Sequence, residues 1–210
     1  MKKLLSLLEI IKYLIMFYLY LLIGMIVLGI IIGVLQNSAK KRQKNTLLER
    51  IKNKEGFNPD YTLFSHYYDN LLALDKTGNQ ILLCELLDDG GIKEKLINFN
   101  DIFEAEIKTN NNTISKISLG GTIAGGVLAG GVGALIGSQS NKKTVDKIKT
   151  ITLKINTKDF DNPIINFNLF ESIDKKGDNP DGDKVKETLK NAEKWEGMLK
   201  IILEENKLTH

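Results

Sequence analysis

Near its N-terminus the chain carries its longest apolar run, Tyr13 to Leu35, in which 23 residues pass without a charged side chain. A helix rises about 1.5 Å per residue, so a run of this length spans the ~30 Å hydrocarbon core of a bilayer. A helix also satisfies its own backbone groups where no water is present. The pattern predicts a transmembrane helix at 13–35, preceded by a short N-terminal segment at 1–12.

Two other structures could account for an apolar run of this kind, a buried helix of a soluble domain and a cleaved signal sequence. A soluble domain of this size has too little surface to bury a helix that is apolar all round. A cleaved signal sequence has an apolar region of about 7–15 residues followed by a small-residue cleavage site. Here the run is longer and only Ser38-Ala39 resembles such a site, so the sequence favours an uncleaved anchor over a cleaved leader.

Beyond residue 60, short apolar runs alternate with turn signals, as is typical of antiparallel strands. Leu71–Leu74 and Gln80–Leu87 flank a turn that contains Gly78-Asn79, which predicts a hairpin. Ile151, Leu153 and Ile155 alternate with polar residues, the period-2 pattern of a half-buried strand. The same criteria predict further strands at 96–99, 103–108 and 165–169.

The chain ends in a predicted amphipathic helix, with Asp183 as its N-cap. Its apolar positions recur at a spacing of three or four: Val185, Leu189, Ala192, Trp195, Met198, Leu199 and Ile202. The fold class is therefore α+β. We expect an N-terminal transmembrane helix, a basic linker at 36–60, and a small antiparallel β barrel or sandwich at 61–205 with this helix as its C-terminal cap.

A glycine-rich insert interrupts the strands between residues 117 and 141, a stretch of 25 residues without a charge. Its glycines form small-xxx-small pairs, a spacing that lets another helix backbone approach closely. These pairs are Gly121 with Gly125, Gly126 with Gly130, and Gly133 with Gly137.

Three roles compete for this insert. A phosphate-binding loop fails on spacing, and no predicted strand enters it. A second membrane crossing would place the strands on its two sides in different compartments. We therefore favour a glycine-zipper hairpin that packs on itself, on another copy or against the bilayer. In the anchor, Gly29 and Gly33 form a further small pair, so these two and the six zipper glycines are the predicted membrane or oligomer contacts.

Charge sets the predicted orientation and excludes one class of partner. Three basic residues precede the anchor, whereas seven follow within twenty residues: Lys40, Lys41, Arg42, Lys44, Arg50, Lys52 and Lys54. This asymmetry places the C-terminal domain in the cytoplasm, and the single cysteine, Cys84, agrees with that compartment. A formal net charge of +3 is too small to suggest nucleic-acid binding.

The polar residues of the sequence form no recognisable catalytic or metal-binding motif. His66 has no second histidine near it, and Cys84 lies in an apolar run where a small buried hydrophobe is the ordinary role. Asp178 to Asp183 resembles a calcium loop, but Gly177 and Thr188 stand where ligands are needed, so it is interpreted as a turn and helix cap. We expect no cofactor and no metal, and we do not expect an enzyme.

The ordered features resemble a known group of proteins. They are the Lys76-Thr77-Gly78-Asn79 turn, the Phe99–Ile102 corner, the glycine-rich insert, the strand at 150–155 and the helix with Ala192, Trp195, Leu199 and Ile202. In the order of these features the chain is similar to uncharacterised membrane-anchored proteins of Gram-positive bacteria and their prophages. Their pleckstrin-homology-like domain is interrupted by a glycine zipper. The resemblance implies a bent seven-strand sheet capped by a C-terminal helix.

Two functional hypotheses follow. The first is a membrane-tethered cytoplasmic binding or scaffold module, which recruits a protein or lipid partner. The second is a membrane-acting effector, in phage exclusion or stress response, whose glycine zipper inserts or forms homo-oligomers at the bilayer.

Overall fold

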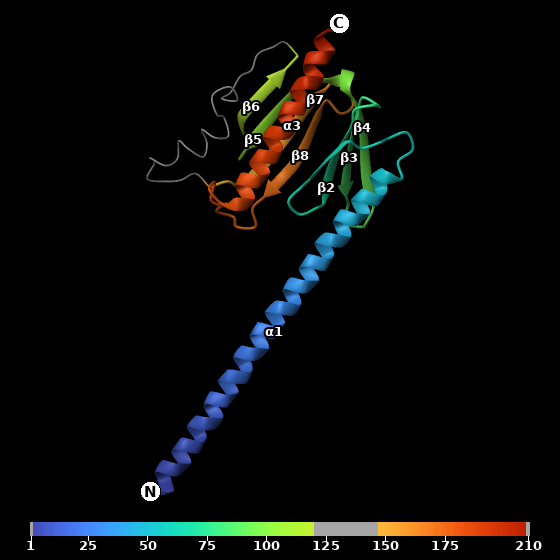
Figure 1. Ribbon diagram of the computed structural model, residues 1–210. Helices are drawn as coiled ribbons and strands as arrows, with labels where there is room; N and C mark the ends of the chain where they lie inside the picture. The colour runs from blue at the N-terminus through green and yellow to red at the C-terminus, as the bar shows by residue number, and fades with distance from the viewer. Residues whose placement is uncertain (1, 120–146, 209–210) are drawn as a thin grey trace. The chain divides into compact units, whose positions relative to one another are not determined.

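The computed structural model describes residues 2–119 and 147–208, and the chain divides into two compact units, Met1–Arg42 and Gln43–His210. The first unit is the greater part of helix α1 (Lys2–Lys52), whose last ten residues belong to the second. Figure 1 shows the remaining elements. They are β1 (Tyr61–Phe64), β2 (Asn70–Asp75), β3 (Gln80–Leu86), β4 (Ile92–Asn98), η1 (Phe99–Asp101), β5 (Ile102–Thr109), β6 (Asn112–Ser118), β7 (Thr150–Thr157), β8 (Ile164–Glu171) and α3 (Asp183–Leu208).

The strands form two four-stranded sheets in which every neighbouring pair is antiparallel. The first sheet has the order β1-β2-β3-β4, and the second has the order β6-β5-β7-β8. The predicted hairpin is confirmed, with Leu74 opposite Ile81 and Asp75 opposite Gln80. The Asp75 carboxylate accepts the Gly78 N–H at 2.8 Å and thereby closes the turn. The architecture is an open sandwich rather than a closed barrel.

One core joins the inner faces of both sheets to α3. Leu72 and Ile81 from the first sheet and Leu153 from the second belong to the same buried cluster. The helix covers the second sheet, and its predicted apolar face is buried except at Met198, which is partly exposed. Near its end, the Asn206 side chain donates to the carbonyl of Phe99 at 2.7 Å. The C-terminal cap that the spacing of the apolar residues predicted is confirmed.

A second buried cluster lies on the outer face of the first sheet, opposite the shared core. Leu47, Ile51 and Phe57 pack there against Leu71 and Leu82. The predicted linker at 36–60 is therefore wrong over residues 36–52, where α1 continues as a helix. Leu47 and Ile51 stand one helical turn apart, so both face the sheet and are removed from water.

Two strands were not predicted. β1 has only four residues, too few to show an alternation, and it pairs with β2 from Tyr61 opposite Leu74. β6 carries Ser115 at a fully buried position, and a polar residue there hides the apolar period. β6 also includes Ile117 and Ser118, with which the expected insert begins. The rest of the insert, from residue 120, lies outside the described residues.

Candidate functional site

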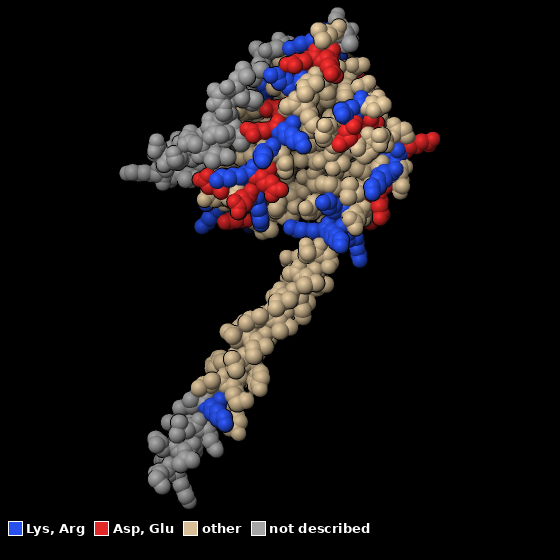
Figure 2. Space-filling view, in the orientation of Figure 1, with Lys and Arg blue, Asp and Glu red and all other residues tan. Residues whose placement is uncertain are grey.

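The first unit offers an apolar surface that nothing in the described chain covers. Within α1, the stretch from Lys12 to Lys52 contains a window of mean hydropathy 2.8, none of which is buried. Figure 2 shows a long stretch of the helix without charged side chains, and in the sequence no charged residue stands between Lys12 and Lys40. By length and composition this helix can cross a membrane, and it includes the predicted span at 13–35.

The predicted glycine contacts fall into two groups. At Gly29 and Gly33, no described atom other than the adjacent residues and the nearby backbone of the helix itself lies within 4 Å of the position that a Cβ would take. A neighbouring backbone can therefore approach the helix there, and self-association through this pair stays a prediction. The six zipper glycines are outside the described residues: Gly121, Gly125, Gly126, Gly130, Gly133 and Gly137.

The segment Gln43–Lys52, the last part of α1, is attached to the first sheet by apolar and by charged contacts. Leu47 and Ile51 are buried against it. At the edge of the sheet, the Glu94 carboxylate of β4 forms ion pairs with Arg50 and, at 2.6 Å, with Lys54. Burial by itself would raise the pKa of Glu94, but Lys54 and Arg50 outweigh it and lower that pKa. Sequence reasoning missed this attachment, because the Leu47–Ile51 spacing is compatible with it but equally with a linker.

The two groups that most suggested chemistry in the sequence are structural. Burial, together with the nearby Glu94 charge, raises the pKa of the Cys84 thiol to about 11, so it is a poor nucleophile. The ring of His66 packs against Tyr67 and Phe170, with ring centroids 5.0 and 5.6 Å away. Within residues 2–119 and 147–208, no group of three or more His, Cys, Asp or Glu side chains could hold a metal ion.

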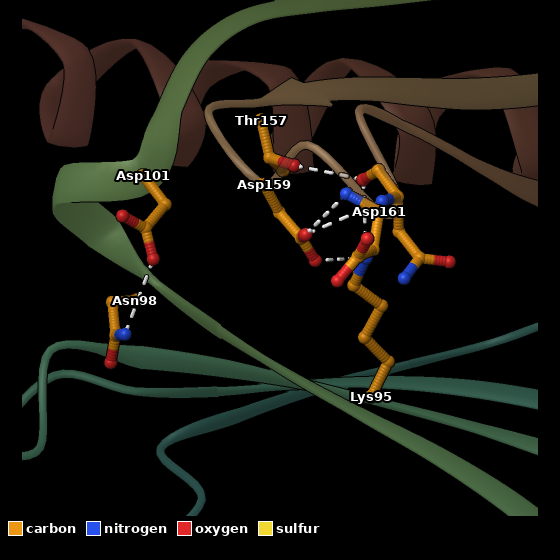
Figure 3. Close-up of polar contacts among 7 residues, drawn as sticks. Lys95, Asn98, Asp101, Thr157, Asp159 and Asp161 are labelled. Carbon is orange, nitrogen blue, oxygen red and sulfur yellow. Dashed lines mark hydrogen bonds and ion pairs between the residues drawn. The ribbon is translucent and has the colours of Figure 1, made fainter.

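The turn between β7 and β8 contains a dense polar network (Figure 3). Asp159 accepts the Asp161 N–H at 3.0 Å and pairs with the ammonium of Lys95 on β4, also at 3.0 Å. Lys95 in addition donates to the carbonyl of Asn162, which accepts the Thr157 hydroxyl. The network ties the edge of the first sheet to a turn of the second. Because these bonds engage the Asp159 carboxylate, we interpret the network as a structural cross-link.

The outer face of the second sheet carries a ladder of alternating charge. Lys116 on β6 pairs with Glu104 at 2.6 Å, and Lys154 on β7 pairs with Glu106 at 3.1 Å. Glu106 also accepts the Thr113 hydroxyl at 2.8 Å. Two carboxylates and two ammonium groups balance, so this ladder has no strong potential of either sign.

Comparison with known proteins identifies a family and two relatives that the chain resembles. Residues 61–171 match the family described as glycine zipper containing PH domain. The chain is 33% identical to the SPbeta prophage-derived uncharacterized membrane protein YomJ of Bacillus subtilis (strain 168), over 86% of this chain and 84% of that protein. It is 35% identical to a protein of Bacillus phage SPbeta named "Immunity protein", over 70% of this chain and 76% of that one. No solved structure matches it.

These matches confirm the resemblance that the sequence predicted and the pleckstrin-homology-like fold, but the described residues form eight strands in two sheets and not the seven-strand sheet that the resemblance implied. The apolar helix and a relative that is named a membrane protein together support membrane anchoring. The connection between β1 and β2 contains no Lys or Arg, so the phosphoinositide binding of some pleckstrin-homology domains is not carried over. The chain belongs to the family of glycine zipper containing PH domains.

Proposed function

We propose that the chain is a membrane-tethered, non-enzymatic binding or scaffold module, with segment 1–12 outside and the folded domain in the cytoplasm. The observation that carries the proposal is helix α1, which combines an uncharged apolar stretch with a segment, Gln43–Lys52, that completes the domain. One helix thus supplies both the anchor and a core element. A module attached in this way is kept at the membrane at a high effective concentration for a partner on the same surface.

The basic residues after the apolar stretch support the cytoplasmic orientation. Ser38-Ala39 lies inside α1, so a peptidase would have to unwind the helix to reach it. Both observations favour an anchor that stays attached to its domain.

The orientation is tested by cysteine labelling in intact cells. Cys84 is buried with a raised thiol pKa, so the wild-type chain provides a low background. Phe160→Cys introduces a thiol at a fully exposed position on the β7–β8 turn. We expect no reaction with a membrane-impermeant maleimide until the cells are permeabilised, whereas Ser6→Cys should react in intact cells. Labelling of Phe160→Cys in intact cells would overturn the orientation.

A second function is favoured by one relative. The name "Immunity protein" of the phage relative fits a membrane-acting effector, whose zipper glycines insert or assemble at the bilayer. Removal of residues 1–38 separates the two functions. A soluble monomer supports the tethered module, whereas membrane partitioning that Gly125→Leu and Gly126→Leu abolish supports the effector. The same substitutions should remove any protection of cells against phage challenge, and unchanged protection would contradict the effector.

A further inference from the structure

Helix α3 and the edge strand β6 meet at a buried polar pair that the proposed function does not use. Ser115 on β6 is fully buried, and Glu196 on α3 is 2% exposed. Neither Ser115 Oγ nor Glu196 Oε1 has a hydrogen-bond partner within the described part of the chain. The two side chains come from elements that pack together, and Ser115 lies close enough to influence the carboxyl of Glu196.

Among the residues that the structure describes, no cation is placed to neutralise Glu196. Ser115 lies opposite Ile107 on the inner face of the second sheet, so its neighbour Lys116 points to the outer face. There Lys116 is engaged by Glu104. On α3 the ionisable group that acts on Glu196 is Glu193, one turn before it, and its negative charge is repulsive. Within the described residues, an ionised Glu196 would therefore be a buried charge without a compensating cation.

We propose that Glu196 and Ser115 form a proton-held latch, in which the neutral carboxyl of Glu196 keeps α3 closed on β6 and its ionisation loosens that contact. A neutral carboxyl can donate its O–H to the Ser115 hydroxyl, whereas a carboxylate could only accept from that hydroxyl and would keep a full charge in a buried site. Among the described strands, β6 has a partner on one side only, so loosening of α3 exposes a strand at the edge of the sheet.

The electrostatic environment agrees with this geometry. Burial raises the pKa of Glu196; the Ser115 hydroxyl opposes that rise in part, and Glu193 reinforces it. The pKa of Glu196 is higher in the folded chain than in the unfolded chain. The contribution of the latch to stability is therefore complete when the pH is below the unfolded pKa. Its contribution is lost as the pH rises through the folded pKa.

The test measures hydrogen exchange of the full chain in detergent micelles between pH 5 and pH 8, corrected for intrinsic exchange rates. We expect the protection of β6 peptides to fall about tenfold as the pH rises, the effect of one buried charge left uncompensated. Glu196→Gln should keep the low-pH protection throughout this range. Glu187→Gln, the same change at an exposed position of α3 away from this pair, should retain the wild-type pH dependence.

A second measurement does not depend on how the variants fold. Carbon NMR of labelled glutamate side chains in the wild-type chain should show Glu196 titrating above the ordinary glutamate range. Titration of Glu196 at an ordinary value would overturn the latch, as would Glu196→Gln with the pH dependence of the wild type. Neither result bears on the membrane tether, since the proposed anchoring does not involve α3 or β6.

Discussion

The two sheets of the domain differ in what covers their outer faces. In the first sheet, β2 is buried at every position but its first, because the shared core covers one face and Gln43–Lys52 covers the other. In the second sheet, β8 alternates between buried and exposed residues over most of its length, and its outer face is polar. The continuous apolar run Leu71–Leu74 therefore signals a cover on both faces. That cover comes from outside the domain limits that the strand pattern suggested.

The largest expected effect comes from removing this cover. A chain that begins at Tyr61 lacks Leu47, Ile51 and Phe57, and leaves the apolar outer face of the first sheet in water. We expect it to aggregate or to stay unfolded, because a large contiguous apolar patch is exposed. Solubility and size-exclusion chromatography with light scattering measure the outcome.

The matched control is a chain that begins at Gln43 and retains the covering segment. It should be soluble and monomeric, with a cooperative unfolding transition. Equal behaviour of the two truncated chains would mean that the segment does not stabilise the domain.

A single substitution tests the same contrast more gently. Leu47→Ala should lower the free energy of unfolding by about 2–5 kcal/mol, because it leaves a cavity at a fully buried position. Asn166→Ala, at an exposed position on the outer face of the second sheet, should change it by about 0.5 kcal/mol or less. Chemical denaturation of the Gln43–His210 chain compares the two, and similar losses would contradict the contrast between the faces.

The sequence predicted the parts of this fold whose signal is local. The anchor, the β2–β3 hairpin and the apolar face of α3 each follow from periodicity and turn residues within one segment. The attachment of Leu47 and Ile51 could not be assigned in this way, because two apolar residues among lysines suit a linker equally well until the sheet supplies their partner. β6 was missed for a related reason. Buried Ser115 interrupts the apolar alternation of this strand, and Glu196, the residue of α3 near Ser115, lies far along the chain.

Glu106 on the second sheet gives a smaller, pH-dependent effect. Burial alone would raise its pKa, but the hydrogen bonds from Thr113 and Lys154 outweigh burial and lower the pKa below its ordinary value of 4.5. Its contribution to stability is therefore present above pH 4.5 and is lost as the pH falls through the folded pKa. We expect Glu106→Gln to cost about 1–3 kcal/mol at pH 7. In urea denaturation series, that cost should disappear in acid, the reverse of the behaviour expected for Glu196→Gln.

The smallest effect is expected where charge, rather than apolar area, joins Gln43–Lys52 and the adjacent Lys54 to the first sheet. Glu94→Gln removes the ion pairs to Arg50 and Lys54, whose side chains are 53% and 34% exposed. Ion pairs with such exposed partners contribute up to about 1 kcal/mol and weaken in salt. The variant should therefore lose less stability than Leu47→Ala, and the difference from wild type should shrink further at high ionic strength. A loss as large as that of Leu47→Ala would show that the ion pairs hold the segment. In that case the ion pairs, and not the burial of the apolar outer face, would be the main contribution that holds the segment on the first sheet.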